Sequence, residues 1–372
     1  MSNFRVLHVA ETITGGIATY LKLMSICADE DKHQSFYLIP SQQVDELSNC
    51  REIITHGGGR SIKGLIILFL AVFSTYRHLK PDVIYAHSFF AGVVCSLFKL
   101  ANPKVKFIYC PHGWAMFREK GNFYRRFATL IERKMSFIPD QVVNISQYEH
   151  DKTSAIGFSK NSMLIENSVE DFSERELEHY PDAIQDLNGT AVNSSHTPNS
   201  EESIIKLLFV GRLDEQKGID ILLDAMVSLD RSDINLKVVG AGVLRNFSHQ
   251  ANRENIEFCG WQPNKTIDQF YRWADVLVVP SRWEGFGLVV LESYRNGTPV
   301  LVSNRGALPG LVDEGITGHV FDLSVESLTE AISSLKKGSL SSMSQDCKKK
   351  FAERYSPGDF VRKQAELIRE FD

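Results

Sequence analysis

The chain has 372 residues, of which 43% are hydrophobic and 23% charged, and its formal net charge at pH 7 is −5. This length can hold two domains of ordinary size, each with its own core, and the composition is that of a globular protein rather than a disordered or fibrous one. The acidic balance argues against nucleic acid as a partner.

The cysteines and the start of the chain indicate a cytoplasmic protein. The six cysteines are scattered without a C-x-x-C pair, which argues against a zinc site or a disulfide framework and fits a reducing compartment. Met1 leads into a strand-like segment, so we expect no signal peptide. The most apolar segment, 64–74, is too short to span a bilayer. A packed helix is favoured there, and partial insertion into a membrane face is the alternative.

Strand and helix signals alternate through the first part of the chain. A strand at 5–10 is followed by Gly15-Gly16 and by a helix from about residue 18. Further apolar strands are predicted at 35–39, 83–86, 105–109 and 141–145. Such alternation predicts a parallel sheet covered on both faces, in a first domain over residues 1–170.

A polar segment separates this domain from a second alternating one. Residues 182–203 are rich in turn residues and predict a mobile loop, within a linker over 171–203. The second domain, 204–356, has predicted strands at 204–210, 235–239, 256–259, 276–279, 299–302 and 318–321. The fold class is therefore α/β, with two doubly wound, Rossmann-like domains. Ligands bind beyond the carboxyl ends of such strands, so we expect the site in a central cleft that the two domains face.

Residues 284–292 are the most informative segment. Glu284 lies in a loop after the strand at 276–279, with Gly285 and Gly287 beside it, and Glu292 lies in the helix that follows. Glycines allow backbone N–H groups to approach a ligand, and a helix N-terminus favours an anion. The pattern fits a phosphorylated, hydroxyl-rich ligand, although two glutamates alone would also fit compensation of the helix dipole.

Two cations follow the strand at 204–210. Arg212 can bind phosphate oxygens in a fork, and Lys217 can act as a point charge. Alone they would fit a surface loop with ordinary salt bridges; together with the Glu284 segment they favour a phosphate site. No His, Asp or Cys cluster has the spacing of metal ligands, so we expect no metal.

The first domain offers weaker signals. His112 follows the strand at 105–109 beside Gly113, at a strand end where active groups gather, whereas core or rim roles are predicted for His8 and His87. The Gly15-Gly16 loop lacks a full G-x-G-x-x-G, which argues against a dinucleotide fingerprint.

Basic residues are densest between residues 104 and 134, where they interleave with aromatic and aliphatic ones. The basic members of this stretch include Arg118, Lys120, Arg125, Arg126, Arg133 and Lys134. A stretch of this kind can lie on an anionic membrane surface. The alternative is a solvated helix with one face in the core.

Together these motifs resemble family 4 glycosyltransferases of the group 1 type, which have the GT-B fold. The matching residues, in the family's order, are Gly15-Gly16, His112-Gly113, Gly211-Arg212 with Lys217-Gly218, Glu284 to Gly287 with Glu292, and Gly297-x-Pro299-Val300. One departure is Glu166-Asn167-Ser168, where the family usually has Pro-Asn-Gly. The resemblance also implies that a last helix over 357–371 crosses back to the first domain.

The resemblance implies a role for each residue. Arg212 and Lys217 would neutralise the diphosphate of the donor. Glu284 would contact hydroxyls of the transferred sugar, Glu292 the nucleotide ribose, and His112 the sugar near the reacting carbon. The expected donor-binding set is Gly15, Gly16, Gly211, Gly285, Phe286, Gly287, Leu288 and Glu292. A front-face route, in which the leaving phosphate accepts the acceptor's proton, needs no protein nucleophile.

The implied function is retaining transfer of a sugar from a UDP- or GDP-sugar, without metal or other cofactor, to a glycan acceptor. We expect a polyprenyl-diphosphate-linked acceptor in bacterial O-antigen, capsule or lipopolysaccharide synthesis, and an enzyme peripheral on the inner membrane face. Two alternatives remain: a nucleotide-sugar epimerase of the same fold, and a non-catalytic nucleotide-sugar-binding protein. The presence of both the Arg212/Lys217 and Glu284/Glu292 pairs argues against the second.

Overall fold

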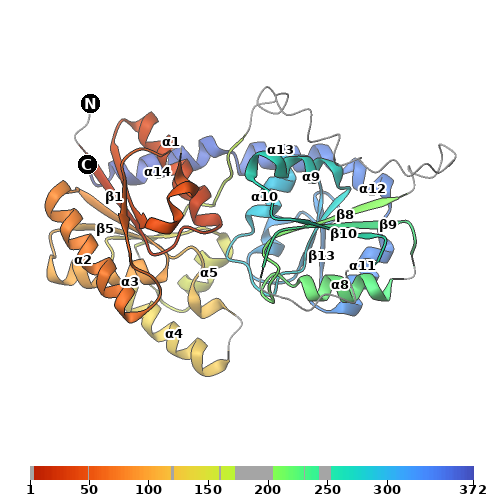
Figure 1. Cartoon of the computed structure of the whole chain (residues 1–372), viewed down its shortest axis with the longest axis horizontal. Coiled ribbons are helices and arrows are strands. Elements are labelled where there is room, and N and C mark those ends of the chain that lie inside the picture. The colour runs from red at the N-terminus through yellow and green to blue at the C-terminus, as the bar shows by residue number, and fades with distance from the viewer. Residues whose placement is uncertain are drawn as a thin grey trace. The chain divides into compact units, whose positions relative to one another are not determined.

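The computed structural model describes residues 4–48, 50–118, 121–158, 161–171, 204–229, 231–242 and 253–372. The chain divides into two compact units (Figure 1). The first comprises Met1–Glu170 and Tyr355–Asp372, and the second comprises Asp171–Arg354. From residue 172 onward, the linker predicted over 171–203 lies outside the described residues.

The first unit contains a seven-stranded sheet in the order β3-β2-β1-β4-β5-β6-β7, with every pairing parallel. Its strands are β1 (Arg5–Ala10), β2 (Gln34–Pro40), β3 (Ile53–His56), β4 (Val83–His87), β5 (Lys106–Cys110), β6 (Gln141–Asn144) and β7 (Ser162–Leu164). The chain runs outward from β1 to β3 and then returns to the other side of β1. The strand order therefore reverses between β1 and β4, the position where doubly wound sheets bind ligands.

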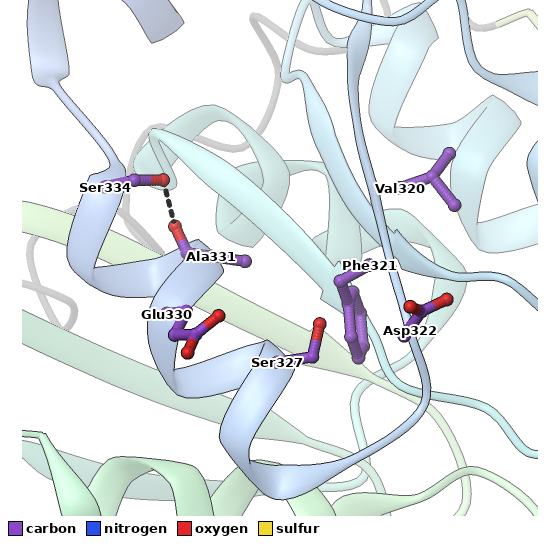
Figure 2. Close-up of a pocket in the computed structure, with 7 residues that line it drawn as sticks. All are labelled: Val320, Phe321, Asp322, Ser327, Glu330, Ala331 and Ser334. Carbon is purple, nitrogen blue, oxygen red and sulfur yellow. Dashed lines mark hydrogen bonds between the residues drawn. The ribbon is translucent and has the colours of Figure 1, made fainter.

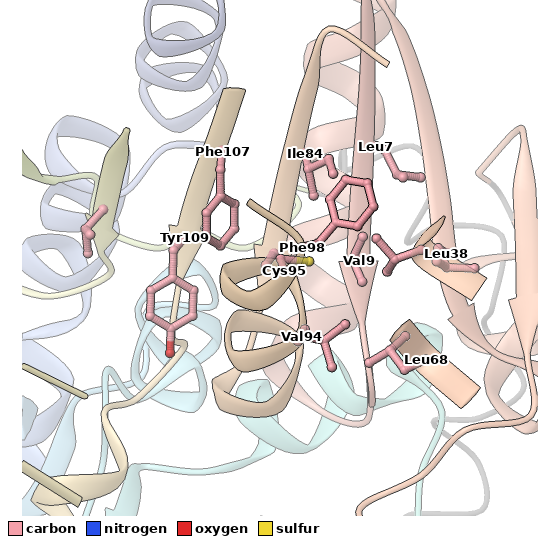
Figure 3. Packing of buried hydrophobic residues seen from close by; sticks show 14 of the residues in the cluster. Leu7, Val9, Leu38, Leu68, Ile84, Val94, Cys95, Phe98, Phe107 and Tyr109 are labelled. Atoms are coloured by element: carbon pink, nitrogen blue, oxygen red, sulfur yellow. The ribbon is translucent and has the colours of Figure 1, made fainter. Parts of the chain in front are cut away.

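Helices cover both faces of this sheet. They are α1 (Gly16–Asp31), α2 (Ile62–Leu79), α3 (Phe89–Ala101), α4 (Asn122–Met135), α5 (Gln147–Ala155) and α14 (Pro357–Arg369), with short 3-10 turns η1 (Ser41–Leu47) and η2 (Ala115–Phe117). Leu7 and Val9 of β1 pack with α2 and α3 in one core (Figure 3). Ala10 lies on the opposite face of β1 from Val9 and packs with α1 in another core, because successive side chains of a strand point to opposite faces.

The last helix, α14, belongs to the first unit, where it packs against α1. Its N-terminus is capped by Ser356, with Pro357 in the first turn. Its apolar stripe is buried and comprises Phe360, Val361, Ala365, Leu367 and Ile368, and the polar Gln364 on the same face is wholly buried as well. This burial ties the end of the chain to its beginning.

The second unit repeats the plan with six parallel strands in the order β10-β9-β8-β11-β12-β13. The strands are β8 (Ile205–Val210), β9 (Ile234–Val239), β10 (Ile256–Gly260), β11 (Val276–Val279), β12 (Val300–Ser303) and β13 (Gly318–Phe321). The helices are α8 (Ile219–Ser228), α9 (Asn264–Trp273), α10 (Leu288–Arg295), α11 (Val325–Ser334), α12 (Lys337–Ser342) and α13 (Ser344–Arg354), with the 3-10 turn η4 (Leu308–Leu311). The predicted α/β class with two Rossmann-like units is confirmed.

Two wholly buried carboxylates hold the segment that follows β5. Glu132 of α4 accepts hydrogen bonds from the backbone N–H groups of Ala115 and Met116, at 2.7 and 2.9 Å. Glu149 of α5 accepts one from Trp114 at 3.2 Å. Burial raises the pKa of Glu132 to about 7 and that of Glu149 to about 8, against an ordinary value of 4.5. The fold therefore holds both groups protonated more strongly than the unfolded chain does.

We predict a pH-dependent stability difference between the wild type and Glu149→Gln. Between about pH 4.5 and pH 8 the folded state binds the Glu149 proton more tightly than the unfolded state, so this group's contribution to stability is present at low pH and is lost as the pH rises. Glutamine resembles the protonated acid and does not ionise. The unfolding free energy of Glu149→Gln, relative to that of the wild type, should therefore increase by roughly 1 kcal/mol for each unit of rising pH across that window.

Urea unfolding at pH 5, 6.5 and 8 measures this difference. Glu46→Gln, at an exposed glutamate of the same unit, is the control, and its unfolding free energy should differ from that of the wild type by the same amount at all three pH values. A wild-type-to-E149Q difference that stays constant from pH 5 to pH 8 would contradict the raised pKa.

Candidate functional site

Two neighbouring loops form the candidate site of the second unit. β8 continues into residues 211–218 and β11 into residues 280–287, and the two strands are paired in parallel. Their carboxyl ends therefore lie side by side. The loops are also joined directly, because the backbone N–H of Arg282 donates to the Gln216 carbonyl at 2.8 Å and the Gln216 side chain donates to the Trp283 carbonyl at 3.2 Å.

One glycine allows this close approach, and a second lies where α10 begins. Gly218 has φ 69°, and a Cβ atom there would lie 1.9 Å from the carbonyl oxygen of Pro280. Gly287, which caps the N-terminus of α10, has φ 105°. Both conformations are readily adopted only by glycine. Any other residue at position 218 would push the two loops apart.

An ion pair connects the two loops. Lys217 Nζ lies 2.5 Å from Glu284 Oε1, and the Ser281 hydroxyl donates to the same oxygen at 2.9 Å. The Glu284 side chain is 9% exposed and that of Lys217 20% exposed, so the pair is largely shielded from water. We predicted from the sequence that these two residues bind different parts of a ligand, and the structure brings them into direct contact.

Arg212 is held loosely at the edge of the same loop. Its guanidinium lies 3.0 Å from Asp214 and donates to Gln216 at 3.1 Å, while 60% of the side chain is exposed. Asp214 also accepts the backbone N–H of Lys217 at 3.0 Å. Asp214, Gln216 and Ser281 were not predicted as site residues. Asp214 could have been found, because an Asp three residues before Lys217 is a recognisable turn signal.

Glu292 is in the second turn of α10 and is linked to α9. The hydroxyl of the buried Tyr271 donates to Glu292 Oε2 at 2.5 Å. Burial raises the pKa of Glu292, and the hydrogen bond from Tyr271 opposes this effect. Before Glu292, the buried residues Gly285, Phe286 and Gly287 lead into α10, and Leu288 is its first residue. The helix therefore begins where the loop that carries Glu284 ends.

In the first unit, the predicted residues lie at the ends of β1 and β5. Gly15, with φ 80°, caps the N-terminus of α1, and Gly16 is the first residue of that helix. His112 follows β5 with φ 51°, and Gly113 has φ 109°. His112 Nε2 lies 2.9 Å from His87 Nδ1. Core or rim roles were predicted for His8 and His87, and both side chains are buried. Their connection to His112 was not foreseen.

A pocket of about 410 Å³ lies elsewhere in the second unit, between the end of β13 and α11 (Figure 2). None of the predicted site residues lines it. Its charged lining residues, Asp322 and Glu330, are both acidic, so the pocket does not suit a diphosphate. In the part of the chain that the structure describes, no group of three or more His, Cys, Asp or Glu side chains is arranged to hold a metal ion.

Comparison with known proteins identifies the family. Residues 14–171 match the family described as Glycosyltransferase Family 4, and residues 194–354 match Glycosyl transferases group 1. A Klebsiella pneumoniae protein, described as an uncharacterized 41.2 kDa protein in the cps region, is 33% identical over 318 residues, which is 84% of each chain. The chain belongs to the group 1 glycosyltransferases of family 4 and is a transferase.

Solved structures agree on the fold. Anabaena Alr3699/HepE in complex with UDP-glucose is similar with a TM-score of 0.78 and 16% identity, over 99% of this chain and 100% of that one. WaaG, a glycosyltransferase involved in lipopolysaccharide biosynthesis, is similar with a TM-score of 0.70 and 18% identity, over 98% and 99% of the two chains. These similarities establish the GT-B fold.

We predict that Arg212→Ala and Lys217→Ala each lower turnover by about 10²–10³-fold, the effect of losing one preorganised group that stabilises developing charge. Steady-state rates of sugar transfer measure this. Lys349→Ala, at an exposed lysine of α13, is the control and should keep the wild-type rate.

The two variants should differ in stability. Arg212 is mostly exposed, so its loss should leave the melting temperature unchanged. Loss of Lys217 leaves the shielded Glu284 without its ion pair and should lower the melting temperature. Near-normal turnover in both variants would show that these cations do not act on the donor.

Proposed function

We propose that this protein is a retaining glycosyltransferase that moves a sugar from a UDP- or GDP-sugar to a polyprenyl-diphosphate-linked glycan during synthesis of a surface polysaccharide. The observation that carries the proposal is the Lys217–Glu284 ion pair at the ends of β8 and β11, beside Arg212 and the N-terminus of α10. This arrangement places two cations, Arg212 and Lys217, and a helix N-terminus where a diphosphate would be bound. The K. pneumoniae relative from a cps region and the likeness to WaaG support the pathway.

In this proposal the second unit binds the donor. Arg212 and Lys217 neutralise the diphosphate, most strongly as the nucleotide leaves, because that is when negative charge accumulates on the phosphate. Glu284 accepts hydrogen bonds from sugar hydroxyls, and Glu292 accepts them from the ribose. The N–H groups of Gly285 to Gly287 and the start of α10 add further donors. The solved complex of HepE with UDP-glucose supports a UDP-sugar as a first donor to test.

Beyond the positive charge of Arg212 and Lys217, the reaction itself needs little from the protein. In a front-face route the acceptor hydroxyl attacks the anomeric carbon from the side of the leaving diphosphate. The C–O bond to the phosphate breaks, the new glycosidic bond forms, and the leaving phosphate oxygen takes the acceptor's proton. His112 contacts the sugar near the reacting carbon. Gly15 and Gly16 leave room for the phosphates and the acceptor.

The test is transfer from UDP-glucose, UDP-galactose, UDP-N-acetylglucosamine and GDP-mannose to polyprenyl-diphosphate glycans. A donor that binds the folded state should first raise the melting temperature; at 100 times its Kd the gain is about 2.7 kcal/mol. We expect release of nucleotide and a product whose anomeric configuration matches the donor's. Isomerised donor without transfer would indicate an epimerase, and a thermal shift without any reaction would indicate a binding protein.

A second arm addresses metal ions. Because two cations are present to neutralise the diphosphate, turnover should persist in excess EDTA. Complete loss that Mg²⁺ or Mn²⁺ restores would refute the metal-independent mechanism.

The exposed face of α4 supports a peripheral position on an anionic membrane. Phe123, Phe127 and Leu130 recur at helical spacing and are 86%, 57% and 55% exposed. The side of α4 that faces the unit carries Ala128, Glu132 and Met135 instead. A solvated helix would turn its large apolar residues inward, so this arrangement favours contact with a lipid surface.

Helix α2 also has an exposed apolar side. By length and composition alone it could cross a membrane, but Leu68 and Val72 on its inner side are part of the first unit's core. Its outer side exposes Ile62, Ile66 and Leu70. α2 packs against α3, and α3 packs against α4 (Figure 1). The packed-helix interpretation of this segment agrees with the structure, and its outer face remains apolar.

We predict that the protein sediments with anionic liposomes at low salt and is released at 1 M salt, where the Debye length is about 3 Å. Changing Arg125, Arg126, Arg133 and Lys134 to Gln should weaken binding, since each basic residue near the surface contributes about 1 kcal/mol. Changing Phe123 and Phe127 to Ser should weaken it at every salt concentration, because apolar contact is not screened.

The control carries the same charge change at basic residues on other elements, namely Lys32, Arg51, Lys348 and Lys349 to Gln. It should bind like the wild type, and all variants should retain hydrolysis of the donor. Failure of the wild type to bind anionic liposomes at low salt would favour a soluble acceptor.

A further inference from the structure

Three histidines, on β1, at the end of β4 and just after β5, form one hydrogen-bonded series in the first unit. His112 Nε2 lies 2.9 Å from His87 Nδ1, and His87 Nε2 lies 3.0 Å from His8 Nδ1. His8 Nε2 lies 3.3 Å from the hydroxyl of Ser35 on β2. His8 and His87 are 1% and 0% exposed, so the series leads from His112 into the interior.

All three imidazoles are neutral at physiological pH. Burial lowers the pKa of His8 and of His112 to about 3, and it lowers the pKa of His87 well below its usual range. A neutral imidazole has one nitrogen that donates and one that accepts. Because Nε2 of one ring meets Nδ1 of the next at both links, the three rings must share one tautomer. Either all three are protonated on Nδ1 or all three on Nε2.

The position of the His112 ring is fixed from a second direction. Tyr20 of α1 meets it edge-on, with ring centroids 4.6 Å apart and an interplanar angle of 90°. The Tyr20 hydroxyl lies 2.7 Å from that of Tyr85, and Gln364 of α14 hydrogen-bonds to both. The backbone of His112 is left-handed, a strained conformation for a non-glycine residue that persists only where the surroundings hold it.

We propose that His87 and His8 are positioning residues that hold His112 in a single neutral tautomer and so decide whether its Nδ1 donates or accepts a hydrogen bond to the transferred sugar. The other ring nitrogen of His112 is committed to His87, so Nδ1 is the atom that remains for a substrate. The proposal rests on the proposed function, in which His112 contacts that sugar. Packing alone does not call for two buried imidazoles, His8 and His87, behind the partly buried His112, since buried polar groups are costly unless every one is satisfied.

The first test is nitrogen NMR of the histidine-labelled wild-type protein, with signals assigned through single His-to-Gln variants. We expect the same tautomer for His8, His87 and His112 between pH 6 and pH 8. Scalar coupling between nitrogens across both N–H···N links is expected as well. Opposite tautomers at His87 and His112, or titration of either ring within this range, would overturn the proposal.

The second test is kinetic. His87→Phe removes both hydrogen bonds and should lower kcat by about tenfold, or about 1.4 kcal/mol, while the KM for the donor stays within twofold. His87→Asn places an amide near the former Nδ1 position and should restore most of the rate, because it can again bond to His112. Wild-type kcat in a folded His87→Phe variant, or equal loss in both variants, would contradict a positioning role.

His8→Phe provides a variant with less disturbance, in case His87→Phe does not fold. His8 stacks on Tyr37 with ring centroids 5.0 Å apart, and phenylalanine preserves that stacking while it removes the inner link. We expect a several-fold loss of kcat. An unchanged kcat would contradict a role for the inner His87–His8 hydrogen bond. His112→Ala separates this proposal from the proposed function: normal transfer in that variant would refute the role of His112 itself, whatever the tautomers are.

Discussion

Both units depend on the pairing of two strands that are not consecutive in the chain. β1 pairs with β4 in the first unit, and β8 pairs with β11 in the second. Parallel pairing brings the carboxyl ends of these strands to one edge of the sheet, and the chain there leaves in loops rather than in tight hairpins. Residues 67 positions apart, Lys217 and Glu284, meet as an ion pair for this reason. His8 and His87, 79 positions apart, meet for the same reason.

The glycines at these edges set how closely the loops can approach. Gly218 must lack a Cβ because the carbonyl of Pro280 occupies that space. Gly306 is comparable: a Cβ there would lie 2.2 Å from the carbonyl oxygen of Glu284. The loop that carries Glu284 is therefore bordered at Pro280 by Gly218 and at Glu284 by Gly306. The Glu284 carboxylate is itself bonded to Lys217 and Ser281, and a side chain held in this way loses little freedom when it binds a ligand.

Most of the fold could be predicted from the sequence because buried parallel strands are long apolar runs. Strands β1, β11 and β13 have the predicted bounds, and several others differ by a residue at an end. β3 and β7 were missed. Both lie at the edges of the sheet, and their residues are mostly only partly buried, so neither shows the apolar run that identifies a central strand.

The site could be predicted only as separate pieces. The sequence identifies Arg212, Lys217, Glu284, Glu292 and His112 by residue type and by position after strands. It does not indicate that Lys217 and Glu284 are partners, because that contact depends on which strands pair. The same holds for α4, where the sequence left two alternatives open. The buried side of that helix carries Glu132, bonded to the backbone of Ala115 and Met116, and this tertiary contact leaves the aromatic residues on the exposed side.

The C-terminal helix shows how stability and the histidine site are linked. α14 contributes Phe360, which meets Tyr20 edge-on at 4.9 Å, and Gln364, which bonds to Tyr20 and Tyr85. Tyr20 in turn meets His112, the residue with the strained backbone. The left-handed backbone conformation of His112 is maintained only because its neighbours are themselves fixed by packing. Residues from the last helix of the chain therefore help to hold a ring that follows β5, and the burial that ties α14 to α1 also serves the geometry of His112.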